Sequence, residues 1–150
     1  MRKETVKAPV TNVKLFALSP IDQIPLIHVD GTICAGFPSP ADDYLETQID
    51  LKAELVRNPD ATFIVRVQGD SMQDDGINDG DVLIVDRSVT ATNGVIAVCY
   101  LNNAFTVKRI EKKGSRIRLL PANPAFAPIV IQEGDELMIW GVVTFIIKKP

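Results

Sequence analysis

The segment from Gly69 to Asp81 contains a serine in a position suited to acyl-transfer chemistry. This segment, GDSMQDDGINDGD, follows one apolar stretch and leads into another, so we expect it to join two strands. A serine at such a turn can direct its hydroxyl and a backbone N–H toward one point, as attack on a carbonyl requires. Taken alone, Ser71 is more often a hydrogen-bonding residue of a solvated turn, so the motif leaves both interpretations open.

A lysine inside an apolar segment is the second candidate. Lys108 lies in FTVKRI, which follows the pair Asn102–Asn103. Because asparagine tolerates positive φ, we expect a tight hairpin turn there. If Lys108 points inward, burial lowers its pKa, and a neutral lysine can act as general base for a serine hydroxyl. Alternation does not decide its orientation, since both faces of this strand would carry apolar and polar residues, and an exposed lysine is the alternative.

A pair of small residues, Ala35 and Gly36, is the third candidate. The pair lies in CAGFPSP, a segment rich in residues that favour extended backbone. Proline shortly after the pair keeps the chain extended, and two small residues can enter a narrow cleft backbone first. A plain linker is the alternative interpretation.

The elements that must position these residues are mostly strands. We expect strands at residues 62–68, 81–87, 94–101, 104–112, 116–120, 129–132 and 136–147. Residues 82–85 and 95–98 are apolar on both faces, as central buried strands are. One helix is expected over residues 50–58, capped by Asp50 and ended by Pro59. The expected fold class is therefore mainly β with one short helix.

Residues 1 to about 40 differ from the rest of the chain. Five prolines interrupt them, and no helical period survives between these prolines. The same segment is too apolar for a solvated tail. We interpret it as an extended N-terminal arm that lies on a folded body, its own or a partner's. An edge strand of the same domain is the alternative.

Composition excludes several classes of protein. The 150 residues suffice for one domain with a sizeable core, and a net charge of −3 argues against a general nucleic-acid binder. The single histidine, His28, excludes a histidine-rich metal site, and Cys34 and Cys99 could form one disulfide at most. No apolar run approaches the ~20 residues of a membrane span, and no apolar signal segment begins the sequence. We expect a cytoplasmic protein with no metal and no cofactor.

Together, the three segments resemble the LexA/UmuD family of self-cleaving serine peptidases (S24 type), and within it the UmuD branch. The matching motifs are AGFPSPA from Ala35, GDSM around Ser71 with a following GD, FTVK ending at Lys108, and WGVV from Trp140. Ser71 follows Ala35 by 36 residues and precedes Lys108 by 37. Each motif is weak, but the ordered set is specific. The UmuD branch often has cysteine before the scissile glycine, whereas Ala35 is typical of LexA-type repressors.

The resemblance implies a LexA/signal-peptidase-like β-fold and a Ser-Lys dyad. Ser71 would be the nucleophile and Lys108 the general base, with the backbone N–H groups of Asp70 and Ser71 as oxyanion donors. The scissile bond would be Ala35–Gly36 of the protein's own arm. Self-cleavage would remove residues 1–35 from a peptidase-like domain of residues 36–150.

The resemblance also implies a function in the bacterial SOS response. RecA filaments on single-stranded DNA would stimulate the cleavage. The processed form would then act in SOS mutagenesis as a subunit of an error-prone translesion polymerase, a UmuC-like Y-family enzyme. A cytoplasmic homodimer is implied, with no direct sequence-specific DNA binding and no membrane contact.

Other functions for the same motifs stay open. A LexA or phage repressor needs a DNA-reading domain before the cleavage site, so this chain would be the C-terminal domain of a truncated repressor. A signal peptidase shares the Ser-Lys chemistry but needs a membrane anchor or a large apolar surface. A non-catalytic binding module would keep the fold with a silent dyad.

Overall fold

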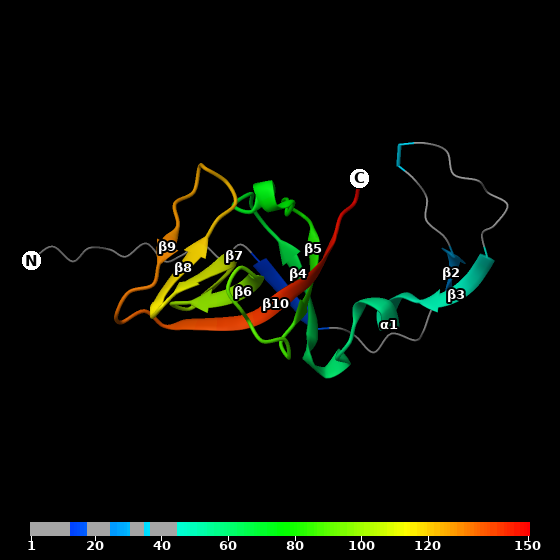
Figure 1. Ribbon diagram of the computed structural model, residues 1–150, viewed down its shortest axis with the longest axis horizontal. Helices are drawn as coiled ribbons and strands as arrows, with labels where there is room; N and C mark the ends of the chain where they lie inside the picture. Colours follow the sequence, from blue (N-terminus) through cyan, green and yellow to red (C-terminus); the bar gives the residue numbers. More distant parts are fainter. Residues whose placement is uncertain (1–12, 18–24, 31–34, 37–44) are drawn as a thin grey trace, which may run out of the picture. The chain divides into compact units, whose positions relative to one another are not determined.

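The computed structural model describes residues 13–17, 25–30, 35–36 and 45–150. The chain divides into two compact units, one made of residues 1–18 and 58–150 and the other of residues 19–57. Antiparallel strands dominate both units (Figure 1), so the expected mainly β fold class is confirmed. Among the described residues, no helix combines the length and the apolar character needed to cross a bilayer.

The larger unit contains an eight-stranded sheet in the order β1-β4-β5-β10-β6-β7-β8-β9. Every neighbouring pair in it is antiparallel. Its strands are β1 (Val13–Ala17), β4 (Thr62–Val67), β5 (Val82–Asp86), β6 (Ile96–Leu101), β7 (Ala104–Lys113), β8 (Arg116–Leu120), β9 (Ile129–Val130) and β10 (Leu137–Ile147). Two 3-10 helices, η1 (Pro59–Ala61) and η2 (Gln73–Asp75), lie in its connections.

The smaller unit contains a two-stranded sheet followed by an α-helix, the one α-helix among the described residues. Strands β2 (Pro25–Asp30) and β3 (Leu45–Asp50) pair with each other, and α1 (Leu51–Leu55) follows directly. The side chain of Asp50 caps α1 by accepting from the Lys52 and Ala53 N–H groups, as expected. The helix ends before residue 58 because the chain is already extended at Val56.

The N-terminal segment contains strands that the sequence did not predict. Val13–Ala17 pairs with β4 as the edge strand β1, so here the edge-strand alternative holds. The pairing of β2 with β3 was also not expected: β2 (PLIHVD) has no clean apolar–polar alternation, and the alternation of β3 (LETQID) was overlooked. Residues 1–12, 18–24 and 31–34 of the proposed arm lie outside the described residues.

The central strands and the hairpin turn agree with expectation. Strands β5 and β6 flank β10 in the middle of the sheet, and most of their side chains are buried. Asn102 and Asn103 have φ angles of 47° and 68°, the left-handed conformation of a tight β-hairpin turn. This turn sets the register in which β7 returns along β6.

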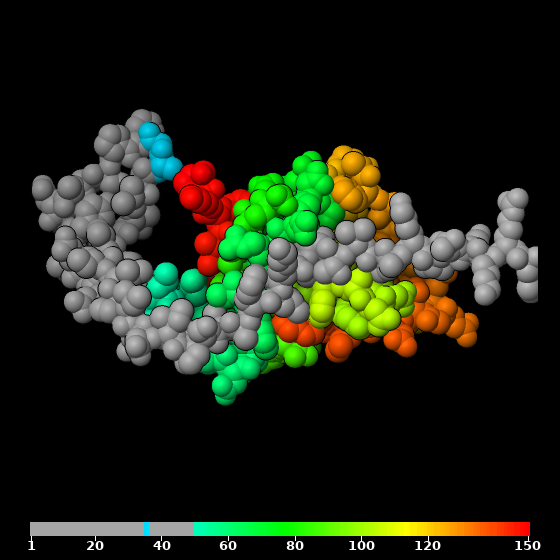
Figure 2. Space-filling model, turned by 180° about the vertical axis from the view of Figure 1, so that it is seen from behind, coloured from blue at the N-terminus to red at the C-terminus, as the bar shows by residue number. Residues whose placement is uncertain are grey.

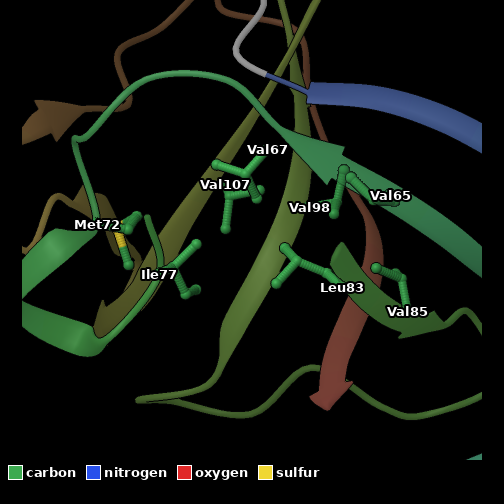
Figure 3. Close-up of a cluster of buried hydrophobic side chains, with 8 residues drawn as sticks. All are labelled: Val65, Val67, Met72, Ile77, Leu83, Val85, Val98 and Val107. Carbon is green, nitrogen blue, oxygen red and sulfur yellow. The ribbon is translucent and has the colours of Figure 1, made fainter. Parts of the chain in front are cut away.

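The main hydrophobic cluster joins sheet residues to two residues of the loop between β4 and β5. Met72 and Ile77 come from this loop, and both are almost fully buried. Figure 3 shows them in the same cluster as the strand residue Val107. The other members of this cluster are Val65, Val67, Leu83, Val85 and Val98. The loop is therefore anchored to the sheet by its own apolar side chains.

Strand β7 is buried on both of its faces because the sheet curls (Figure 1). Val107 packs in the cluster just described, whereas Ile110 packs in a second cluster with Ala97, Cys99, Leu101 and Leu119. Lys108, which lies between these residues, is buried as well, whereas the neighbouring Arg109 is partly exposed.

The WGVV motif has a packing explanation at its glycine. Strand β10 shifts register on both sides, next to Gly141 where it pairs with β6 and after Val143 where it pairs with β5. A Cβ atom on Gly141 would lie 2.6 Å from Cγ1 of Val85, which is closer than carbon atoms pack. Only glycine fits here without displacing the buried Val85 side chain.

Candidate active site

Ser71 lies at the start of the loop that connects β4 to β5. Gly69, with φ of 96°, turns the chain after β4, and the buried Met72 follows the serine. Ser71 itself is only 6% exposed. The serine thus lies at the boundary between a solvated turn and the hydrophobic core, rather than at an exposed loop tip.

Three hydrogen bonds hold this loop to the segment that follows β8. The Ala122 N–H donates to the Ser71 carbonyl (2.8 Å), and the Asp74 N–H donates to the Ala122 carbonyl (2.8 Å). The side chain of Asn123 donates through Nδ2 to the Asp70 carbonyl (3.0 Å). We call residues 122–123 the clamp segment, because they contact the loop on both sides of Ser71.

Three carboxylates of the same loop have structural partners. Asp79 accepts from the Gly69 N–H (2.7 Å), and Asp81 accepts from the Asn78 N–H (2.8 Å). Asp75 forms an ion pair with Arg109 of β7 (3.0 Å). Within the described part of the chain, no group of three or more histidine, cysteine or acidic side chains is arranged to hold a metal ion.

Lys108 points into the protein from β7 and reaches Ser71. It is 6% exposed, and its Nζ lies 2.9 Å from Oγ of Ser71. The same nitrogen lies 2.7 Å from Oγ1 of Thr106 and 3.0 Å from the carbonyl oxygen of Val107. The question that alternation left open is thereby answered: the lysine is inside.

Burial determines the ionisation of Lys108. It lowers the pKa of the ammonium group from 10.5 to about 8, while the neighbouring Cys99 acts weakly in the opposite direction. About a tenth of such lysines are neutral at pH 7. Burial also raises the pKa of the Cys99 thiol to about 12, so this free cysteine stays protonated around neutral pH.

The three partners of Nζ suit a neutral amine. The Val107 carbonyl can only accept, and the Thr106 hydroxyl is placed to accept as well, so together they use the two N–H groups of a neutral lysine. As an ammonium group, Lys108 also donates to the Ser71 hydroxyl; once it has lost this proton, the lone pair faces the hydroxyl, which can then donate to it. This arrangement can generate a nucleophilic serine oxygen without histidine.

The remaining predicted residues lie in two places. Asp70 adjoins Ser71 in the loop, so the two expected oxyanion donors are consecutive backbone groups. Ala35 and Gly36 belong to the smaller unit and are exposed in a bend (cyan in Figure 2). A Cβ atom on Gly36 would meet no atom within 4 Å. Cys34 and Phe37, which flank the pair, lie outside the described residues.

Sequence reasoning assigned no role to Thr106 or Asn123. Thr106 was detectable, because a residue two positions before Lys108 on a strand lies on the same face. Asn123 gave no such indication: it is far from Ser71 in the sequence and lies in an irregular connection.

Comparisons with known proteins identify the family of this chain. Residues 25–144 match the model of the family described as Peptidase S24-like. Protein SamA of Salmonella typhimurium strain LT2 is 49% identical over 115 residues, which are 77% of this chain and 79% of that protein. Protein MucA of Escherichia coli is 49% identical over 113 residues, 75% of this chain and 77% of MucA.

A repressor is also among the relatives. LexA repressor 1 of Xanthomonas campestris pv. campestris is 42% identical over 129 residues, which are 85% of this chain and 63% of the repressor. The resemblance inferred from the motifs is confirmed by these matches. The family model covers most of the chain, and the chain therefore belongs to the Peptidase S24-like family.

Proposed function

We propose that this protein is a self-cleaving serine peptidase that cuts its own Ala35–Gly36 bond with Ser71 as nucleophile and Lys108 as general base. The observation that carries the proposal is the 2.9 Å contact between Lys108 Nζ and Ser71 Oγ, two groups that are both buried. A lysine with a pKa of about 8 is neutral often enough near neutral pH to accept the serine proton.

The proposed reaction uses these groups in the following order. Lys108 takes the proton of Ser71, and the serine oxygen attacks the carbonyl carbon of Ala35. The oxyanion receives hydrogen bonds from the backbone N–H groups of Asp70 and Ser71. Lys108 then gives its proton to the leaving amine of Gly36, and an ester to Ala35 forms. A water molecule, deprotonated by Lys108, hydrolyses this ester and restores Ser71.

The biological role that we propose is that of a UmuD-like protein in the bacterial SOS response. The similarity to SamA and MucA supports this role. Cleavage removes residues 1–35, and the processed homodimer acts in the cytoplasm as a subunit of a UmuC-like error-prone polymerase. A RecA filament on single-stranded DNA need supply no catalytic atom: it can stimulate cleavage by stabilising the minor conformation in which residues 35–36 enter the site.

Intact-mass analysis tests the cleavage directly. Purified protein is incubated between pH 6 and pH 10, beside a Ser71→Ala variant. We expect residues 1–35 to be lost from the parent alone, at a rate that rises with pH and reaches half its maximum near pH 8, where Lys108 loses its proton. An intact parent at every pH, even with RecA, ATP and single-stranded DNA, would contradict the proposal.

Binding measurements test the role of the processed form. The cleaved product and the uncleavable Ser71→Ala protein are compared for affinity to a Y-family polymerase. We expect the product to bind more tightly, because loss of the apolar arm uncovers surface. Equal affinities would rule out this role while leaving the peptidase activity untouched.

A further inference from the structure

The side chain of Asn123 bridges two backbone groups, one of which adjoins Ser71. Its Nδ2 donates to the Asp70 carbonyl (3.0 Å), and its Oδ1 accepts from the Ala125 N–H (2.9 Å). A carbonyl only accepts and an N–H only donates, so these partners leave one orientation for the amide group. Asn123 is 8% exposed, and water competes little for these bonds.

The Asp70 carbonyl belongs to the same peptide unit as the Ser71 N–H. No cis peptide bond occurs among the described residues, and in a trans peptide the C=O and N–H groups point in opposite directions. The Asp70 carbonyl accepts the Asn123 bond and a longer one from the Gln73 N–H (3.2 Å). Hydrogen bonds that hold this carbonyl also set the direction of the Ser71 N–H. This N–H and the nucleophilic Oγ share one Cα, so an oxyanion formed by Oγ attack is within its reach.

We propose that Asn123 is a positioning residue, which holds the Asp70–Ser71 peptide so that the Ser71 N–H faces the developing oxyanion. This inference rests on the proposed self-cleavage and concerns a second part of its site. The hydrogen bond to the carbonyl also polarises the peptide unit, which strengthens the N–H as a donor.

The rest of the clamp segment separates this role from general support of the loop. The two bonds made by Ala122 are backbone bonds, so they persist when the side chain at position 123 changes. Neither hydrogen bond of Asn123 involves the Ser71 hydroxyl or the Lys108 amine. Loss of the Asn123 donor leaves the Asp70 carbonyl with only the longer bond from the Gln73 N–H, which closes a tight local turn. We therefore expect this peptide to reorient while the contact between nucleophile and base survives.

The variant Asn123→Asp tests this proposal. A carboxylate keeps the acceptor for the Ala125 N–H but loses the donor to the Asp70 carbonyl. We expect the plateau rate of self-cleavage at alkaline pH to fall at least about tenfold, toward the 10²–10³ that loss of an oxyanion donor typically costs. The matched control is Asn58→Asp, which adds the same charge at an exposed side chain with no capping bond and should cleave at the parental rate.

The pH profile keeps this effect distinct from an effect on the base. A new carboxylate raises the pKa of nearby Lys108 and shifts the midpoint of the profile upward. The plateau is measured where Lys108 is neutral in both proteins, so this shift does not contribute to it. Asn123→Ala adds no charge and serves as the second variant, with the same plateau loss expected.

The rate of alkylation at position 71 measures the reactivity of the nucleophile in a reaction that forms no oxyanion. In a Ser71→Cys background, iodoacetamide reacts with the thiolate by displacement, and no tetrahedral oxyanion forms. We expect Asn123→Asp to leave this alkylation rate within about twofold of the background. Falls in cleavage and alkylation together would mean general damage to the loop and would overturn the proposal.

The outcomes separate the two proposals. A parent that does not cleave refutes the proposed function and this inference with it. A parent that cleaves in a Ser71-dependent manner, beside Asn123 variants with the parental plateau, refutes only the positioning role. Loss of plateau rate with normal alkylation supports both.

Discussion

The loop that carries Ser71 and the strand that carries Lys108 are built in different ways. The loop between β4 and β5 contains only a short 3-10 helix, and its position depends on buried Met72 and Ile77 and on the clamp segment. Strand β7 lies between β6 and β8 and is held by ladder hydrogen bonds along most of its length. Tertiary contacts therefore place the nucleophile, whereas strand register places the base.

The pKa of the base and the orientation of the nucleophile therefore have different structural origins. Register determines that Lys108 faces Ala97 across the hairpin, and burial then lowers its pKa. The loop determines the direction of the Ser71 backbone groups, which no strand pairing specifies. Damage to the strand position should therefore abolish the chemistry outright, whereas damage to the loop should act through stability and orientation.

Replacement of Lys108 is expected to have the largest effect. Lys108→Arg keeps a positive charge but cannot lose its proton at working pH, so no base faces Ser71. We expect self-cleavage to fall more than 10³-fold, below detection by intact-mass analysis up to pH 10. Lys108→Met, which removes the charge and keeps much of the volume, should be equally inactive while remaining folded.

Two measurements decide that result. Circular dichroism establishes that both variants retain the β-sheet signal of the parent. Cleavage by the Lys108→Arg variant with a normal pH profile would assign the general base to another group.

Truncation of Met72 tests whether buried apolar side chains anchor the loop that carries Ser71. Met72→Ala leaves a cavity in the core next to Ser71, and such changes cost about 2–5 kcal/mol in free energy of unfolding. Met138→Ala, at a side chain of β10 that is 48% exposed, is the matched control and should change stability by less than about 0.5 kcal/mol. Urea unfolding in a Ser71→Ala background measures both.

The cleavage rate of the folded Met72→Ala protein should fall as well, because the residue adjoins the nucleophile. Equal stabilities for the Met72 and Met138 variants would mean that buried apolar side chains do not anchor the loop. The statement that tertiary contacts place the nucleophile would then be wrong.

The two regions also differ in what the sequence could predict. The strands from β4 to β10 and the turn at Asn102–Asn103 were predicted, because apolar patterning and positive-φ residues are local properties. The inward direction of Lys108 was not decided by patterning, since the curled sheet covers both faces of β7. The resemblance named Ser71 and Lys108, and the structure brings them within hydrogen-bond distance.

Contacts between irregular segments far apart in the sequence could not be predicted from local patterns. The bond from Asn123 to the Asp70 carbonyl joins two irregular segments that no periodicity connects. The strand β1 was only the alternative interpretation of its segment, because five prolines obscured the pattern around it. In both cases the partner, rather than the segment itself, determines the structure.

The smallest predicted effect is on the free energy of unfolding, which burial of the charged Lys108 lowers at neutral pH. The folded protein releases the Lys108 proton at pH about 8, whereas an unfolded chain keeps it to about 10.5. Between these values the unfolded state binds more protons, so the free energy of unfolding rises with pH. Cys99 acts oppositely from pH 9 upward, because its thiol ionises near 9.0 when unfolded and only near 12 when buried. The interval from pH 8 to 9 is therefore where Lys108 dominates.

A comparison of Lys108→Met with its parent, both in a Ser71→Ala background that prevents cleavage, isolates this contribution. The free energy of unfolding of the Lys108-containing protein should rise by about 1 kcal/mol relative to Lys108→Met between pH 8 and 9. Urea unfolding at several pH values measures the difference. If the difference is flat across this interval, the strand does not lower the pKa of Lys108 in the resting protein. Lys108 would then have to lose its proton when residues 35–36 enter the site. The loop that carries Ser71 would in that case influence the ionisation of the base as well as the orientation of the nucleophile.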